Sequence, residues 1–564
     1  SWVPISKDLT TNTNRYDLET MDNRVWSSDA LYDTGAMSKY ATLTSIEESP
    51  KVEGLLYTGS DDGLIHVSED GGQNWHRGGA LPNVRARSFI NDIEASRHDA
   101  NTLFAVVDAH KFGDFSPYVF MSTDRGSTWK SISGDLPSGT IVWVLKQDHV
   151  NENLLFIGTE YGIYFSPNKG LNWIKLDGGV PTIAFRDLEL HPRDNDLVGA
   201  SFGRGFYILD DYAPLRELSN AINQKGNTLF SVRDAWWYVP SVPMQAKGMP
   251  GQGSTSFVTE NPPFGAVFTY YLHDVPKTSK EQRKDSEKAL REKNLSIPFP
   301  GWERLKEEAN ENEPLVLLLV RDANGSAIRW VKGTAKRGLQ RTNWDLRLPA
   351  PDPIELTEPD FKPPWAGDAQ GPLAAPGKYT AELFIAQNGK LQSQGAAREF
   401  TVKPVANTVA GTDFGAVAEF QQKTSLLSRQ ISNAGKKMGE AGDRLKHMRA
   451  ALLETPKAPP SLFEGLEALE VSLSGLRERL YGDPIRQRFN EATVPSIQSR
   501  VGGVAYGHWE TRQNPTETQI RDIEIGQADY DAFRGDLVDY LDRLATLEAA
   551  LEAAGAPYTP GRKL

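Results

Sequence analysis

The chain has no cysteine among its 564 residues, which excludes disulfides, thiolate metal sites and cysteine nucleophiles together. No run of about 18 apolar residues occurs, so no segment is expected to span a membrane. The net charge is −12 and no basic stripe is present, which argues against nucleic acid as a partner.

The sequence also lacks the short signatures of several enzyme classes. It has no phosphate-binding loop, no dinucleotide fingerprint, no His-Glu-x-x-His pattern and no Gly-x-Ser-x-Gly elbow. Its nine histidines are scattered without pairs at ligand spacing. We therefore predict no cofactor and no transition-metal site. Clusters of acidic residues remain compatible with calcium, although no twelve-residue calcium loop is present.

What the sequence does contain is an eight-residue pattern, Ser-x-Asp-x-Gly-x-x-Trp, in three copies at residues 68–75, 122–129 and 166–173. The Asp side chain can accept hydrogen bonds from backbone N–H groups of its own turn, and the Gly supplies a backbone angle that other residues resist. We predict a tight hairpin whose residues are structural and not catalytic. These residues are Ser68, Asp70, Gly72, Trp75, Ser122, Asp124, Gly126, Trp129, Ser166, Asn168, Gly170 and Trp173.

Four longer segments repeat around these hairpins. They begin at Ile46, Ile93, Leu145 and Leu188, at intervals of 47, 52 and 43 residues, and each continues into an apolar strand. Such periods are typical of four-stranded propeller blades. Residues 1–220 are therefore predicted to form β-propeller blades, the last of them without a clear fourth strand.

The three hairpin patterns and residues 45–218 resemble bacterial Asp-box (BNR repeat) β-propellers of the sortilin-like, "glycosyl hydrolase"-labelled family. Such propellers usually have more than four blades, so the resemblance implies an incomplete propeller, completed by a second chain or an upstream fragment. The alternative is that a strand around Trp2 closes a four-bladed ring. Because Ser1-Trp2 is similar to the end of a further Asp-box, we expect a longer, exported precursor whose signal peptide lies upstream.

Candidate site residues lie on loops of the propeller face opposite the Asp-boxes, where binding sites on rigid scaffolds are common. Xyloglucanase-type relatives imply two catalytic carboxylates, whereas the arginine triad of sialidases is not found here. Each candidate could also be an ordinary turn residue. The catalytic candidates are Asp61, Asp62 and Glu160, and the binding candidates are Asp108, His110, Asp114, Tyr118, Tyr161 and Arg204.

Two further regions follow a linker at 221–263. Residues 264–404 alternate strands and turns and predict a β-sandwich with a charged, helix-prone insertion at 274–313. Its Thr-Asn-Trp344-Asp-Leu-Arg stretch resembles the Ig-like module of flagellar hook-capping proteins. The Trp236-Trp237-Tyr238 run could stack on sugars, but a wedge between domains is the favoured reading.

Residues 410–564 change to a helical period. Apolar residues recur at heptad spacing from Phe420 through Leu427, Ile431 and Met438 to Leu452, and further helices are expected at 462–480 and 516–554. Short connections predict an antiparallel helical bundle. The bundle is either self-contained or a surface for oligomerisation.

The function predicted from sequence is an exported binding or scaffold protein. Its propeller rim would hold a peptide or a glycan, and the later domains would dock or assemble. The alternative is a glycoside hydrolase that uses two rim carboxylates. Two carboxyl groups about 5–9.5 Å apart in a cleft would favour hydrolysis.

Overall fold

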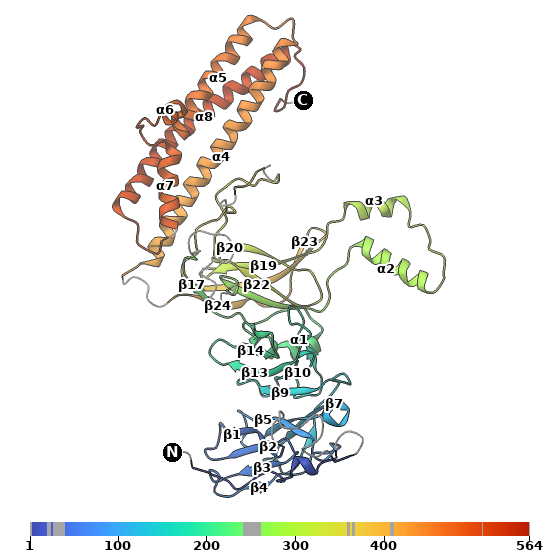
Figure 1. Cartoon of the computed structure of the whole chain (residues 1–564). Helices are drawn as coiled ribbons and strands as arrows, with labels where there is room; N and C mark the ends of the chain where they lie inside the picture. The colour runs from blue at the N-terminus through green and yellow to red at the C-terminus, as the bar shows by residue number, and fades with distance from the viewer. Residues whose placement is uncertain are drawn as a thin grey trace. The chain divides into compact units, whose positions relative to one another are not determined.

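The computed structural model describes residues 3–19, 24–25, 40–240, 261–357, 361–363, 367–405, 411–509 and 511–562 (Figure 1). The chain divides into two compact units, Ser1–Ser231 and Val232–Leu564. In the part of the chain that is described, no helix combines the length and apolarity needed to cross a bilayer.

The first unit consists of four antiparallel sheets, each built from consecutive strands, which we call blades 1 to 4. This agrees with the predicted repeats, and among the described residues blade 4 has three strands where the others have four. Blade 1 is β1 (Leu43–Glu48), β2 (Leu56–Ser60), β3 (Ile65–Ser68) and β4 (His76–Arg77); blade 2 is β5 (Phe89–Ala95), β6 (Leu103–Ala109), β7 (Asp114–Ser122) and β8 (Lys130–Ser131); blade 3 is β9 (Val142–Gln147), β10 (Leu155–Thr159), β11 (Gly162–Ser166) and β12 (Ile174–Lys175); blade 4 is β13 (Phe185–His191), β14 (Asp196–Ser201) and β15 (Gly205–Leu209).

The first strands of successive blades contact one another in order, β1 with β5, β5 with β9 and β9 with β13. Each carries a one-residue bulge at the same place, because its pairing with the second strand skips Thr44, Asn91, Trp143 or Arg186. The first two bulge residues reach the next blade. Thr44 Oγ1 donates to Ile90 O (2.7 Å), and Asn91 Nδ2 donates to Val142 O (2.8 Å). In blades 1 and 2 the bulge residue therefore links the blade to its successor.

The Asp-box hairpins join the third and fourth strands of blades 1 to 3. In the second copy the Asp124 carboxylate accepts from Thr128 N at 2.8 Å, and the Ser122 hydroxyl accepts from Gly126 N at 2.8 Å. Gly126 has a φ of +82°, which an L side chain rarely adopts. Hydrogen bonds from Thr128 keep the pKa of Asp124 below its usual value. The polar groups of Ser122 and Asp124 are therefore hydrogen-bonded within their own turn.

The N-terminal segment lies against blade 1 and not against blade 4. Trp75 Nε1 donates to Ile5 O at 3.1 Å, as Trp173 Nε1 in blade 3 donates to Ile132 O at 3.0 Å. Ile132 follows the Asp-box Trp129 by three positions, and Ile5 follows Trp2 by the same interval. Among the described residues no strand pairs with the outer edge of β15, so residues 3–9 do not close a four-bladed ring, which was the alternative to an incomplete propeller. Trp2 itself lies outside the described residues.

A helical turn and α1 (Leu218–Gln224) follow blade 4, and the short strand β16 (Thr228–Leu229) ends the first unit. In the second unit β17 (Ala235–Trp237) pairs in parallel with β24 (Arg398–Pro404). Part of the predicted linker at 221–263 therefore forms regular structure, which is a correction. Trp237 is buried and its Nε1 donates to Ala374 O at 2.8 Å, whereas Trp236 is exposed. Residues 241–260 of the predicted linker lie outside the described residues.

The second unit begins with a β region. The large sheet runs β17-β24-β22-β19-β20 with β23 beside β22, and β18 pairs with β21. Rings from the two groups of strands meet, because Phe268 lies 5.8 Å from Phe400 and Trp344 lies 5.2 Å from Tyr379. The charged insertion forms two helices, as expected, while an Ig-like assignment stays a prediction. The bounds are β18 (Ala266–Leu272), α2 (Ser279–Glu292), α3 (Trp302–Asn310), β19 (Leu315–Asp322), β20 (Ala327–Gly333), β21 (Gly338–Trp344), β22 (Gly377–Gln387) and β23 (Lys390–Ser393).

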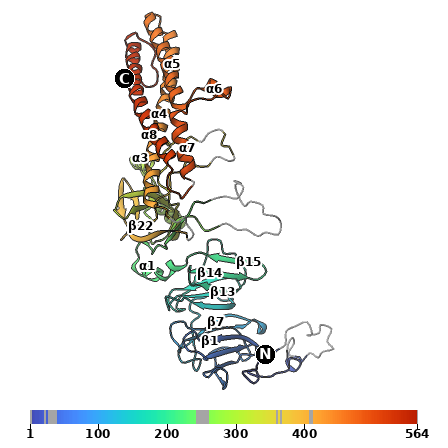
Figure 2. The same cartoon turned by 90° about the vertical axis from the view of Figure 1, so that its left-hand side faces the viewer.

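The C-terminal region is helical, as predicted, and its three long helices lie side by side in both views (Figures 1 and 2). Arg449 and Met438 of α4 bond to Glu470 and Arg477 of α5 respectively, and Arg479 and Ser472 of α5 bond to Asp536 and Arg543 of α8. The helix α5 therefore runs opposite to both. The helices α4 and α8 run parallel, because Gln430 and Arg444 meet Tyr530 and Glu548 respectively. The bounds are α4 (Phe414–Leu453), α5 (Pro460–Tyr481), α6 (Pro484–Arg488), α7 (Ile497–Trp509) and α8 (Glu517–Ala553).

The heptad residues chosen from sequence form the core of this bundle. Leu427, Ile431, Met438 and Leu452 are buried in one cluster, and Phe420 packs against it. His508 is also buried, and Gln421 donates to its backbone oxygen at 3.1 Å, which fits the structural role expected for it.

Replacing Leu544 by Ala should destabilise the bundle by about 2–5 kcal/mol, because the side chain is fully buried and its removal leaves a cavity. Val538→Ala on the same helix, at a half-exposed position, should change stability by about 0.5 kcal/mol or less. Urea unfolding followed by far-ultraviolet circular dichroism measures both. Equal effects of the two substitutions would contradict the assigned core.

Candidate functional site

Strands and loops of blades 2, 3 and 4 bring four side chains together around the indole of Trp143. Trp143, the bulge residue of β9, donates from Nε1 to Glu160 Oε2 at 2.9 Å. The Arg186 guanidinium lies 3.3 Å from the centroid of the Trp143 ring, and the His110 ring meets the indole edge-on at 6.1 Å. Arg186 also lies 5.3 Å from the ring centroid of Phe202. We call His110, Trp143, Glu160, Arg186 and Phe202 the Trp143 cluster.

The Asp108–His110 pair lies at the blade 2 side of this cluster. Asp108 is the buried, second-to-last residue of β6, and its carboxylate accepts from His110 N at 2.8 Å and contacts His110 Nδ1. The His110 side chain keeps 37% of its surface exposed. Asp108 therefore orients the imidazole, part of which remains exposed to solvent.

Basic side chains lie on aromatic rings at two more places in the same loops. The Arg85 guanidinium is 4.2 Å from the Phe112 ring centroid, and Lys111 Nζ is 5.0 Å from that of Phe89. Phe112, Phe115 and Phe202 are themselves exposed. Although the protein as a whole is acidic, this rim offers cations and apolar rings to a ligand.

The structure places Asp61 and Asp62 differently from the free rim acids that the sequence suggested. Both are buried. Asp62 accepts from the backbone N and the hydroxyl of Thr11, both at 2.7 Å, and Asp61 accepts from Thr42 N at 2.8 Å. Burial, helped by the neighbouring negative charge of Asp62, raises the pKa of Asp61. The two carboxylates anchor chain segments that come from before blade 1.

The remaining candidates divide between a local turn and open surface. Tyr118 OH donates to Asp114 Oδ2 at 2.6 Å inside β7, and this bond lowers the pKa of Asp114 and raises that of Tyr118. Tyr161 and Arg204 are exposed. Within the described ranges no hydrogen bond or ring contact joins either of them to the Trp143 cluster.

Three residues of the cluster were missed from sequence: Trp143, Arg186 and Phe202. Trp143 and Arg186 share one repeat position with Thr44 and Asn91, namely the bulge of the first strand. A bulge shifts the strand register by one residue, and no local pattern announces it. Aligning the repeats position by position, and asking which bulge residues are large, was the signal that could have found them.

A second group of charges lies buried between the first strands. Lys146 Nζ of β9 bonds to Glu94 Oε2 of β5 at 2.9 Å, and Asp92 Oδ2 accepts from Leu145 N at 2.9 Å. Burial raises the pKa of Glu94 to about 7 and also raises that of Asp92. Lys146 opposes both shifts. These contacts tie blade 2 to blade 3, so we assign them to the scaffold.

A group of possible metal ligands lies in the hairpin between β13 and β14. Ligand atoms of His191, Asp194 and Asp196 lie within 4.8 Å of one another there, but Arg193 Nε donates to Asp194 and Asp211 N donates to Asp196. These hydrogen bonds already occupy two of the three side chains.

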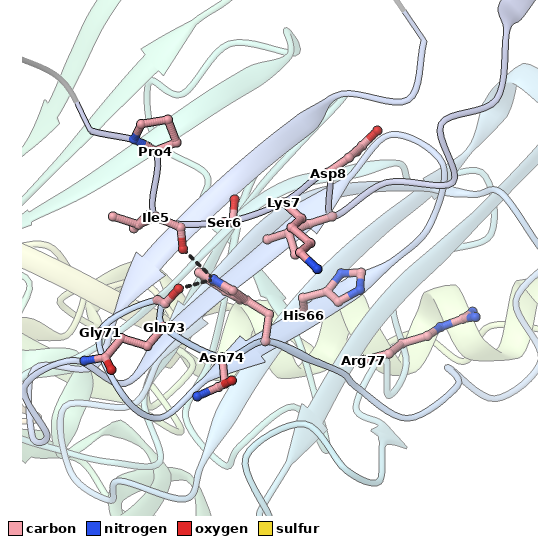
Figure 3. Close-up of a pocket in the computed structure, with 13 residues that line it drawn as sticks. Pro4, Ile5, Ser6, Lys7, Asp8, His66, Gly71, Gln73, Asn74 and Arg77 are labelled. Atoms are coloured by element: carbon pink, nitrogen blue, oxygen red, sulfur yellow. Dashed lines mark hydrogen bonds between the residues drawn. The ribbon is translucent and has the colours of Figure 1, made fainter.

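A hollow of about 770 Å³ lies between residues 4–9 and the first Asp-box. Figure 3 shows Ile5 over that hairpin, with Lys7 beside His66. None of the catalytic or binding candidates chosen from sequence lines this hollow.

No protein-family model and no curated protein matches the chain, so the Asp-box family resemblance stays a prediction. Among solved structures the chain is similar to YCF48 bound to D1 peptide, with 18% identity and a TM-score of 0.24 over 30% of this chain and 52% of that chain. It is also similar to the GH74 xyloglucanase from Xanthomonas campestris, with 12% identity and a TM-score of 0.23 over 28% of this chain and 26% of that chain.

A third likeness is to the GH74 enzyme of Niastella koreensis, with 15% identity and a TM-score of 0.25 over 31% of this chain and 29% of that chain. The chain thus spans about half the length of the YCF48 chain and less than a third of the two GH74 chains. These neighbours are β-propeller proteins. At such scores their ligands and activities carry no argument about this one.

The raised pKa of Glu94 predicts a pH dependence of stability. The folded pKa of Glu94 is about 7, above its ordinary value of 4.5. The contribution of Glu94 to stability is therefore complete below about pH 4.5 and is lost as the pH rises through 7. In Glu94→Gln, the melting temperature of the first unit should fall less between these pH values than in the wild type. Differential scanning calorimetry measures this, with Glu53→Gln at an exposed position as the control. An unchanged slope in Glu94→Gln would contradict the assignment.

Proposed function

We propose that the first unit is a binding module whose Trp143 cluster takes a peptide segment that carries both carboxylates and apolar side chains. The observation that carries the proposal is the Arg186 guanidinium held at 3.3 Å over the Trp143 ring and close to Phe202. A guanidinium on an aromatic face keeps its N–H donors free at its edge, and two of them match a carboxylate.

The supporting residues hold this arrangement in place. Glu160 accepts the Trp143 Nε1 hydrogen and so fixes the rotation of the indole. Asp108 holds the His110 ring that touches the other edge of the indole. A receptor group that is already ordered loses less conformational entropy on binding than a mobile arginine would. Glu160 and Asp108 are therefore positioning residues.

The apolar part of the ligand is inferred from exposed rings of the same blades, among them Phe202 of the cluster and Tyr161, which follows Glu160 in sequence. Phe115, Tyr161 and Phe202 are each more than half exposed. Aromatic residues with arginine are the usual anchors of protein interfaces. Because Arg186 covers one face of Trp143, that face is not open for a sugar ring to stack on. A peptide therefore suits the cluster better than a glycan, and a glycan is kept as an outcome of the test.

The test uses twelve-residue synthetic peptides that contain glutamate and leucine or phenylalanine, each beside a partner with glutamine in place of glutamate. Fluorescence anisotropy with the full chain should show binding of the acidic member only. Arg186→Ala should weaken this binding about tenfold, as expected for loss of a charge-assisted bidentate contact. Arg204→Ala is the matched control, an exposed arginine in the same blade, and should change the affinity less than about twofold.

Two outcomes would overturn the peptide proposal. One is equal binding of the acidic and amide peptides, or of none. The other is selective binding of uronate-containing oligosaccharides on a glycan array that is lost in Arg186→Ala, which would assign the cluster to an acidic glycan.

Glycoside hydrolysis remains a second candidate because the raised pKa of Asp61 is a property that a general acid needs. Against it, Asp61, Asp62 and Glu160 already accept hydrogen bonds from Thr42, Thr11 and Trp143. We expect no turnover of xyloglucan or sialylated oligosaccharides by the full chain, measured as release of reducing sugar. Turnover that disappears in Asp61→Asn or Glu160→Gln would show that the protein is an enzyme.

A further inference from the structure

Blade 4 leaves bare an apolar face that the other blades keep covered. Phe206 pairs with Ala200 at the same register as Ile65 with Gly59, Val119 with Val106 and Ile163 with Gly158. The three counterparts in blades 1 to 3 are at most 4% exposed, whereas Phe206 is 76% exposed. Two positions further along β15, Ile208 is 60% exposed, whereas its counterparts Val67 and Phe165 are at most 1% exposed and Met121 is partly buried.

In each earlier case the cover is the next blade. Ile163 of blade 3 lies against Gly199 of blade 4, where an added Cβ would meet its Cδ1 at 3.1 Å. Ile65 belongs to one buried cluster with Ile90 and Ile93 of blade 2. The face formed by Phe206 and Ile208 is thus built like surfaces that receive a whole blade. An exposed apolar patch of this kind marks an interaction site.

The first strand of blade 4 repeats the two acids through which blade 2 binds blade 3. Asp92 and Glu94 follow the bulge residue Asn91 by one and three positions, and Asp187 and Glu189 follow Arg186 in the same way. Asp92 accepts a backbone N–H from β9 and Glu94 pairs with Lys146. Asp187 and Glu189 are exposed.

These acids select among the occupants that could cover the face. Two copies meeting blade 4 to blade 4 would bring Asp187 and Glu189 against their own duplicates. Blade 1 of a second copy would offer Glu47, which corresponds by position to Lys146, and so would place one carboxylate against Glu189. Like charges that face each other across an interface disfavour it. A second copy is therefore a poor occupant, and a basic strand is a good one.

We propose that the bare face of blade 4 binds a β-sheet segment of a partner polypeptide. The strand of that segment nearest to blade 4 carries a lysine or arginine directly after an apolar residue. Asp187 accepts a backbone N–H of that strand, Glu189 pairs with its basic side chain, and Phe206 and Ile208 pack under its sheet. This surface shares no residue with the Trp143 cluster. Its proposed ligand is basic, whereas the proposed ligand of the cluster is acidic.

Blade 1 shows that a segment outside a blade can serve as its neighbour. Ile5 is seated against Gly72 of the first Asp-box as Ile132 of blade 2 is seated against Gly170 of blade 3. In both places the isoleucine oxygen accepts from the Asp-box tryptophan. Docking at the opposite end of the row would use the same blade-to-blade chemistry.

The experiment uses a labelled synthetic peptide with the sequence of residues 140–160, the two strands that cover blade 2. Fluorescence anisotropy with the full chain should show saturable binding. The double variant Asp187→Asn with Glu189→Gln should weaken it about tenfold, and so should Lys146→Glu in the peptide. Asp177→Asn, an exposed acid after β12, is the control and should have no effect.

A charge swap makes the test specific. Glu189→Lys in the chain should restore binding of the Lys146→Glu peptide, because a true pair shows coupling that two independent changes do not. Absence of binding, or binding that ignores both sets of charges, would overturn the proposal. So would a dimer in sedimentation equilibrium that Phe206→Ser dissociates and the acid variants leave intact, since a second copy would then cover the face.

Discussion

The contact between the first strands of successive blades is the interaction on which the first unit depends. In blades 1 to 3 an apolar side chain on the third strand is covered by the next blade, and in blades 1 and 2 the bulge residue bonds to the next blade as well. One position after the bulge, Ser45 and Asp92 each accept a backbone N–H of the following blade. Blades 1 to 3 are each covered by the next blade. Among the described residues blade 4 has no such cover, so its outer apolar side chains stay exposed. The Trp143 cluster and the bare face of blade 4 both arise at the blade 4 end of the row, where Arg186 folds back onto the preceding bulge residue.

Much of this architecture could be predicted from sequence, and the reasons are local. The Asp-box fixes a hairpin through contacts within eight residues, so its copies located the third and fourth strands of three blades. The heptad from Leu427 to Leu452 located the bundle core for the same reason. The parallel pairing of α4 with α8 could not be predicted from sequence. It depends on α5 and α7, two separate helices that lie between α4 and α8 in the chain.

The candidate site was predictable only in part. His110 and Glu160 were chosen for lying on the right loops, and they do meet, but through Trp143, which no pattern had singled out. Asp61 and Asp62 were chosen as open acids, yet Asp62 is held by Thr11, some fifty positions away in sequence. Long-range hydrogen bonds of this kind decide whether a carboxylate is available for catalysis or holds a chain segment in place. They cannot be predicted from composition or from the spacing of residues in the sequence.

Hydrogen–deuterium exchange across the blades tests most directly whether the outer face of blade 4 is uncovered. In the full chain at neutral pH, the backbone amides of β15 should exchange markedly faster than those of β3 and β11, because local opening is easiest where packing and strand pairing are incomplete. Addition of the basic strand peptide should slow the exchange of β13 and β15 and leave β3 unchanged. Equal protection of β15 and β11 in the chain alone would contradict the account, since the face would then already be covered.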